Sequence, residues 1–244
     1  MYDPPGYLWA ITLAGVIGIA VATCAVLYGG VVRAGLGRRH AALLAGAAAV
    51  VLGGWYTASA AIAAQGGYDQ QTPWLPVAFA GFLALLLALR RIPAVTRALT
   101  APGTARRLPL PHTFRVAGVA FLLTMALGQL PPLFALPAGL GDIATGIAAP
   151  LVALKLAHGA GRRRAQWFNA LGITDLVVAL TLGALTGFQL ISNAPSALGE
   201  LPLALIPTAA VPLLLVLHIT ALSALARSPR TAAPATNPST TIPA

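Results

Sequence analysis

Long apolar runs separated by short polar segments make up most of the chain. A helix that crosses a membrane needs about 20 consecutive, mostly apolar residues, and seven runs approach that length. The pattern predicts an all-α fold, a polytopic transmembrane bundle of about seven helices within residues 1–227. We expect these helices at residues 7–30, 41–64, 74–89, 116–133, 137–157, 167–188 and 201–225.

Two segments lack this apolar character. Residues 92–115 contain four prolines and several arginines, which predicts a long polar connection between the third and fourth helices. Residues 228–244 consist mainly of Pro, Thr, Ala and Ser, which predicts a disordered tail. The segment before the first apolar run has no basic residue, so we expect that run to be a retained helix rather than a secretory signal.

The basic residues indicate the orientation. With seven helices, every Lys and Arg falls on the side that carries the C-terminus, whereas Asp3, Asp69 and Glu200 fall on the opposite side. The positive-inside rule places the basic side in the cytoplasm. We therefore expect a multi-pass plasma (inner) membrane protein with its N-terminus outside. The basic residues are Arg33, Arg38, Arg39, Arg90, Arg91, Arg97, Arg106, Arg107, Arg115, Lys155, Arg162, Arg163, Arg164, Arg227 and Arg230.

Composition supports lipid as the solvent of this chain. Hydrophobic residues make up 58% and charged residues 8% of its 244 residues, whereas soluble domains carry roughly 25% charged residues. The net charge of +10 does not indicate nucleic acid, because the basic residues lie in short clusters between apolar runs. We expect them to meet anionic lipid headgroups, and a homo- or hetero-oligomer is a further expectation.

Three residues within the expected helices could carry chemistry. Asp142 and Asp175 are acids at membrane depth, which is costly and points to a partner, a water-filled cavity or a function. His218 lies about 13 Å from the inner edge and Asp175 about 12 Å, so the two could pair between the sixth and seventh helices. Such a pair could relay protons, or it could simply tie two helices together.

A second polar region is expected near the outer ends of the fourth and fifth helices. Gln129 lies about 10 Å from the outer edge and Asp142 about 8 Å, in a stretch broken by Pro131, Pro132 and Pro137. Irregular backbone at this depth is tolerated against protein or a water-filled cavity, which makes the region a candidate cavity mouth. The alternative is a tight turn capped by Asp142 at the start of the fifth helix.

Other sequence features predict no cofactor and no metal site. No Cys/His metal spacing and no phosphate-binding glycine motif occurs, and Cys24 is a lone cysteine in an apolar run. Two short segments of the sequence are similar, Gly139–Ile143 and Gly172–Leu176, and each has an aspartate three residues after its first glycine. These two segments would run in opposite directions through the membrane.

Three functions remain open from these residues, and whether the chain is an enzyme is not decided. The first is a small proton-linked transporter or permease for ions or hydrophobic small molecules, with Gln129, Asp142, Asp175 and His218 along a polar route. The second is a membrane-embedded enzyme that acts on a lipid or isoprenoid, with an intramembrane Asp as general acid. The third is a non-catalytic scaffold or complex subunit.

Overall fold

A computed structural model describes residues 3–69, 72–187, 190 and 196–227 of the chain. Within these residues every regular element is a helix and no strand occurs, which confirms the all-α prediction. The α-helices are α1 (Gly6–Arg33), α2 (Arg38–Ala64), α3 (Trp74–Leu89), α4 (Pro93–Thr100), α5 (Val119–Ala126), α6 (Pro132–Ala157), α7 (Arg162–Gly187) and α8 (Val211–Arg227). The described residues also contain two 3-10 helices, η1 (Leu110–Gly118) and η2 (Ala197–Gly199), and one π-helix, η3 (Ile206–Ala210).

Among the described residues, five helices are long and apolar enough to cross a membrane: α1, α2, α6, α7 and the η3–α8 segment over Ile206–Arg227. A sixth is obtained if α3 and α4, which are bent by 81° at their junction, count as one span. The apolar segment Leu110–Ala126 is shorter. Large apolar side chains such as Leu43 and Val50 of α2 are about three-quarters exposed (72% and 74%), as suits a surface that faces lipid.

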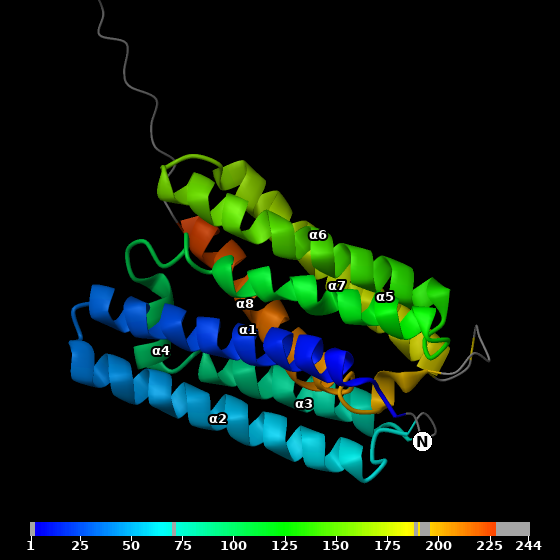
Figure 1. Ribbon diagram of the computed structural model, residues 1–244. Coiled ribbons are helices and arrows are strands. Elements are labelled where there is room, and N and C mark those ends of the chain that lie inside the picture. Colours follow the sequence, from blue (N-terminus) through cyan, green and yellow to red (C-terminus); the bar gives the residue numbers. More distant parts are fainter. Residues whose placement is uncertain (1–2, 70–71, 188–189, 191–195, 228–244) are drawn as a thin grey trace, which may run out of the picture.

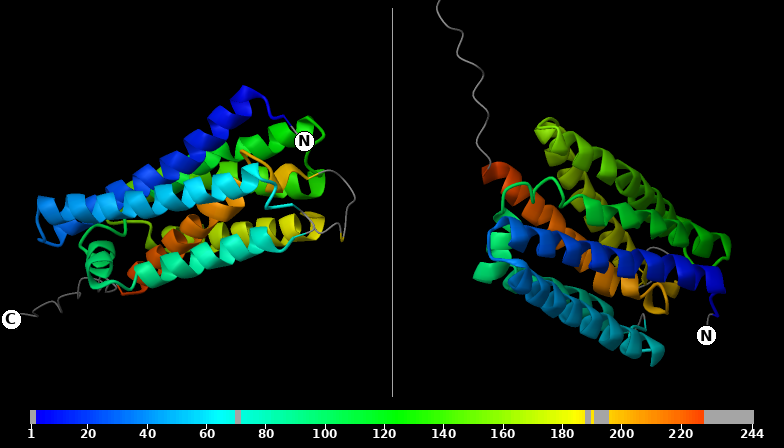
Figure 2. Two further views of the ribbon diagram at one scale, coloured as in Figure 1. Left: turned by 90° about the horizontal axis from the view of Figure 1, so that it is seen from below. Right: turned by 60° about the vertical axis from the view of Figure 1, so that its left-hand side comes forward.

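The long helices lie along one bundle axis (Figures 1 and 2). The first helix begins at one end of the bundle, and α8 finishes at the other (Figure 1). The ends that carry basic residues lie together: α1 ends at Arg33, α2 begins at Arg38, α7 begins at Arg162 and α8 ends at Arg227. We call this the basic end, and the opposite one, where the connection from α2 to α3 contains Asp69, the acidic end.

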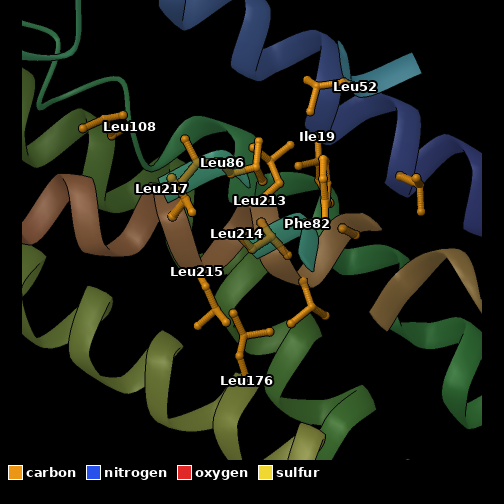
Figure 3. Packing of buried hydrophobic residues seen from close by; sticks show 14 of the residues in the cluster. Ile19, Leu52, Phe82, Leu86, Leu108, Leu176, Leu213, Leu214, Leu215 and Leu217 are labelled. Carbon is orange, nitrogen blue, oxygen red and sulfur yellow. The ribbon is translucent and has the colours of Figure 1, made fainter. Parts of the chain in front are cut away.

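The centre of the bundle is α8, whose side chains are mostly buried. Its leucines pack against side chains from four other helices, so apolar contact surrounds it (Figure 3). Because α8 is buried nearly all round, its sequence is apolar on every side rather than on one face alone. The labelled residues of this core are Ile19, Leu52, Phe82, Leu86, Leu108, Leu176, Leu213, Leu214, Leu215 and Leu217.

The connection between α3 and α6 differs most from the sequence expectation. Residues 92–115, expected to be a polar loop, contain α4 and the first part of η1. The apolar segment that follows runs over Leu110–Ala126 rather than 116–133, and α6 begins at Pro132, so Pro137 lies inside the helix. The helix expected at 201–225 is η3–α8 over Ile206–Arg227. The expected tail, 228–244, and residue 188 lie outside the described residues.

Candidate functional site

Arg115 lies in the interior of the bundle, not in a cytoplasmic loop as the sequence suggested. Its side chain is 1% exposed. Its segment packs against two long helices away from their ends, with Gly15 of α1 against Ala117 and Gly146 of α6 against the backbone of Arg115 and Val116. The sequence partition counted Arg115 among the cytoplasmic residues because it stands directly before an apolar run, where a helix end is the usual expectation.

Two aspartates bind this one guanidinium. Arg115 Nε donates to Oδ1 of Asp142 at 2.7 Å, and Nη2 lies 2.7 Å from the same oxygen. Nη2 also donates to Oδ2 of Asp175. The side chains of Asp142 and Asp175 are 13% and 20% exposed. The site therefore holds two carboxylates against one guanidinium in a region of low dielectric, and charges there need partners to be stable.

His218 is joined to this cluster through Arg115 rather than through Asp175. Its Nε2 lies 3.4 Å from Nη1 of Arg115, and its Nδ1 lies 2.9 Å from Oδ1 of Asn169. Asn169 Nδ2 donates to the carbonyl of Ala165 at 2.7 Å, so Oδ1 must accept. His218 Nδ1 is then the donor and Nε2 the acceptor, which is the neutral imidazole. Asp175 and His218 therefore do not bind each other as expected; both contact Arg115 instead.

A second histidine completes the polar interior. His112, expected in a cytoplasmic loop, is fully buried in η1. Its ring stacks on that of His218 with centroids 3.8 Å apart, and both rings adjoin Phe168. Neither ring nitrogen of His112 has a hydrogen-bond partner among the described residues.

Glycines on three elements make room for these side chains. A Cβ at Gly141 of α6 would overlap the carboxylate of Asp175, and a Cβ at Gly172 of α7 would overlap the ring of His218. A Cβ at Gly118 would overlap Asp142. The two similar segments, Gly139–Ile143 of α6 and Gly172–Leu176 of α7, thus lie together in the structure, because these antiparallel helices bring Asp142 and Asp175 to the same arginine.

A cavity of about 210 Å³ connects this cluster to the acidic end. Asp142 lies at its inner limit, ten residues and about 15 Å from the start of α6, deeper than the 8 Å that the sequence suggested. Tyr68, Asp69 and Thr72 line its outer part. The walls are mostly apolar and come from α3, α5, α6, α7, η2 and η3–α8. They include Leu75, Phe79, Phe121, Phe134, Ala138, Leu176, Leu180, Gly183, Leu198, Ile206 and Val211.

Gln129 does not belong to this arrangement. It lies in the turn between α5 and α6, where its carbonyl accepts from the amide of Ala197 at 3.0 Å. It is not among the residues that line the cavity. The irregular backbone expected there is the short turn from Leu127 to Pro131, and Asp142 is an interior residue rather than a helix cap.

Sequence reasoning missed Arg115, His112 and Asn169. A usable signal existed for Arg115, because two interior acids require a counter-charge and most other arginines stand in pairs or triplets in the expected loops. Asn169 stands three residues before Gly172, which itself stands three before Asp175. Residues three apart lie on neighbouring turns of a helix, so Asn169, Gly172 and Asp175 follow one side of α7.

Fold and site together define a class: an all-helical bundle with membrane-length apolar helices, enclosing an arginine–aspartate cluster at the inner limit of an apolar cavity. The chain belongs to the family described as "Domain of unknown function (DUF8737)", whose model matches residues 72–226. This range contains the whole cluster around Arg115, whereas α1 and α2 precede it. Comparisons with curated proteins and with solved structures gave no match.

Proposed function

We propose that this chain is a multi-pass plasma (inner) membrane protein that transports a small lipophilic cation in exchange for a proton. One observation carries the proposal: an apolar cavity ends at Asp142, one of two carboxylates that share a single guanidinium. When both carboxylates are ionised, the inner limit of the cavity carries one excess negative charge. A proton or a substrate cation neutralises it.

The walls of the cavity favour a lipophilic cation over an inorganic ion. Phe79, Phe121 and Phe134 line it, and aromatic faces attract organic cations through their quadrupoles. The walls offer few hydrogen-bonding groups, which argues against sugars and amino acids. Asp69 at the outer part adds a second acidic group on the path to Asp142.

Exchange follows from competition for one charge. A cation beside Asp142 and a proton on Asp175 both remove the excess negative charge, so binding of one disfavours binding of the other. Such opposed binding is the thermodynamic basis of coupled exchange. Arg115 contacts both carboxylates and therefore transmits this competition between them.

The proposed topology has seven crossings: α1, α2, α3, the Leu110–Ala126 segment, α6, α7 and η3–α8. An odd number is supported by the positions of the start of α1 and the finish of α8 at opposite ends of the bundle. The clustering of arginines at the basic end favours its placement in the cytoplasm. The cavity then opens to the outside.

Binding and exchange can be measured with benzyltrimethylammonium, and its uncharged carbon analogue neopentylbenzene serves as the matched control. We expect the purified protein to bind the cation and not the analogue in calorimetry. In vesicles clamped at zero membrane potential and loaded with a pH dye at acidic pH, we expect the added cation to raise the internal pH.

Variants separate the two carboxylates. Asp142→Asn should weaken cation binding about 30-fold or more, because it removes the carboxylate that would form a close buried ion pair with the cation. Asp175→Asn also removes the excess negative charge, so it should weaken cation binding, although less than Asp142→Asn because Asp142 still lines the cavity, and it should no longer move protons. Asp3→Asn, an exposed acid outside the cavity, should change neither property. Equal binding of the cation and its carbon analogue, or full proton movement in Asp175→Asn, would contradict the proposal.

Two alternatives have weaker support. An enzyme that uses Asp142 as general acid would need a free protonated carboxyl, whereas Asp142 accepts two contacts from Arg115. A scaffold is favoured by one feature, the exposed small-residue surface of α2, where a Cβ added at Gly46, Gly53 or Gly54 would meet no atom within 4 Å. A scaffold does not explain a cavity that ends on a charged cluster, and it predicts no binding of the cation.

A further inference from the structure

A second cavity, of about 170 Å³, lies between α2 and α3 with α8 behind it. Its walls are almost entirely apolar and include Leu44 and Val51 of α2, Leu86 of α3 and Leu213 of α8. None of the aspartates of the first site lines it. This cavity is therefore separate from the proposed transport site, and we call it the basic-end groove.

The basic-end groove occupies the half of the bundle near the arginines. Leu44 lies six residues after the start of α2, and Thr220 lies seven residues before the last residue of α8. At a rise of about 1.5 Å per residue, these positions are about 9 Å and about 10.5 Å from the helix ends. This depth corresponds to the upper part of lipid acyl chains, just below the headgroups.

Two polar groups of this groove have no partner among the described residues. Thr220 lines the groove and is 6% exposed, and its hydroxyl makes no hydrogen bond there. Arg90 lines the groove at the turn between α3 and α4, and the two ion pairs observed within the described residues both belong to Arg115. A ligand with an anionic head, a polar linkage and an apolar tail would satisfy both groups.

We infer that the basic-end groove binds one anionic phospholipid, with its phosphate at Arg90, an ester oxygen at Thr220 and an acyl chain along Leu44, Val51, Leu86 and Leu213. Charge decides the class of occupant: a cationic guanidinium at the groove selects a phosphate with a net negative charge over a zwitterionic headgroup. A second copy of the chain would instead need a complementary apolar face with an acid for Arg90. This inference does not depend on the proposed transport function.

Native mass spectrometry of the purified full chain tests this inference with two lipids that share the same acyl chains, dioleoylphosphatidylglycerol and dioleoylphosphatidylcholine. We expect one phosphatidylglycerol molecule to remain bound under conditions that remove phosphatidylcholine. Arg90→Gln should weaken phosphatidylglycerol binding about fivefold, which corresponds to one basic residue at an anionic surface.

Two matched pairs of variants locate the site. Arg91→Gln removes the same charge one residue away, outside the groove lining, and should retain the lipid. Ala47→Trp fills the groove and should lose the lipid, whereas Ala49→Trp, an exposed residue of the same helix that does not line the groove, should keep it. Equal retention of both lipids, equal losses in Arg90→Gln and Arg91→Gln, or a lipid-free dimer in place of the lipid complex would overturn the inference.

Discussion

Arg115 is the residue on which the buried polar cluster depends. Its guanidinium contacts Asp142, Asp175 and His218 at the same time. The planar fork of an arginine can meet several acceptors in fixed directions, and a lysine ammonium cannot reproduce this geometry. Each neighbour of Arg115 would be left without its partner if the guanidinium were removed.

Replacing Arg115 should therefore destabilise the protein strongly. We expect Arg115→Met to lower the free energy of unfolding by about 3–5 kcal/mol, because it leaves buried carboxylates without a counter-charge. Arg115→Lys should lose less, because it keeps the charge but not the contacts. The measurement is the unfolding midpoint in detergent micelles by scanning fluorimetry.

Arg97→Met is the control for this prediction, because Arg97 is an exposed residue of α4. The same change there should leave the midpoint nearly unaltered. If Arg115→Met unfolded at the same temperature as Arg97→Met, the ion pairs around Arg115 would contribute nothing to stability. Adding Asp142→Asn and Asp175→Asn to Arg115→Met should recover part of the loss, since the buried charges are then removed together.

Among the elements, α8 and its π-turn η3 show how the sequence tolerates prolines in a central helix. Pro212 has no N–H to give to the carbonyl of Thr208 four residues earlier. Trp55 of α2 supplies a substitute donor, because its Nε1 lies 2.9 Å from that carbonyl oxygen. The Trp55 ring also stacks on Phe82 with centroids 4.7 Å apart, so the indole is held in position for this bond.

Trp55→Phe should keep the aromatic stacking and lose the hydrogen bond. We expect it to reduce the free energy of unfolding by about 1–3 kcal/mol, the cost of a buried acceptor without its partner. Trp74→Phe is the matched control, because Trp74 is an exposed tryptophan at the start of α3. Comparable losses in the two variants would show that the Trp55 contact with Thr208 is not specific.

At the level of the whole bundle, the distribution of arginines predicts which residues face the cytoplasm. We place single cysteines in a Cys24→Ser background at Arg106, Arg163 and Asp69, which are all exposed. A membrane-impermeant maleimide added to intact cells should label only the cysteine at position 69. After the membrane is opened, it should label all three.

The result that would contradict this topology is labelling of position 106 or 163 in intact cells. Labelling of one but not the other would show that an odd number of crossings, rather than the proposed two, separates positions 106 and 163. The unmodified Cys24→Ser protein serves as the control for background labelling.

The apolar runs alone predicted an all-helical chain and the approximate places of its long helices, because lipid requires each spanning segment to satisfy its own backbone hydrogen bonds. They also predicted that Asp142, Asp175 and His218 would lie within long helices rather than in loops. The sequence did not predict that residues 92–115 form helical structure, since prolines and arginines there match a loop as well as a 3-10 turn.

Tertiary structure decided which polar groups meet. Asp142 and Asp175 stand 33 residues apart, and Arg115 precedes both on a different element, so their contact depends on how η1, α6 and α7 pack. That packing depends on glycines at Gly118, Gly141 and Gly172, whose missing side chains leave the space that the carboxylates and the imidazole occupy. Hydropathy is local and additive along the chain, whereas complementary shape between distant helices is a property of the folded bundle alone.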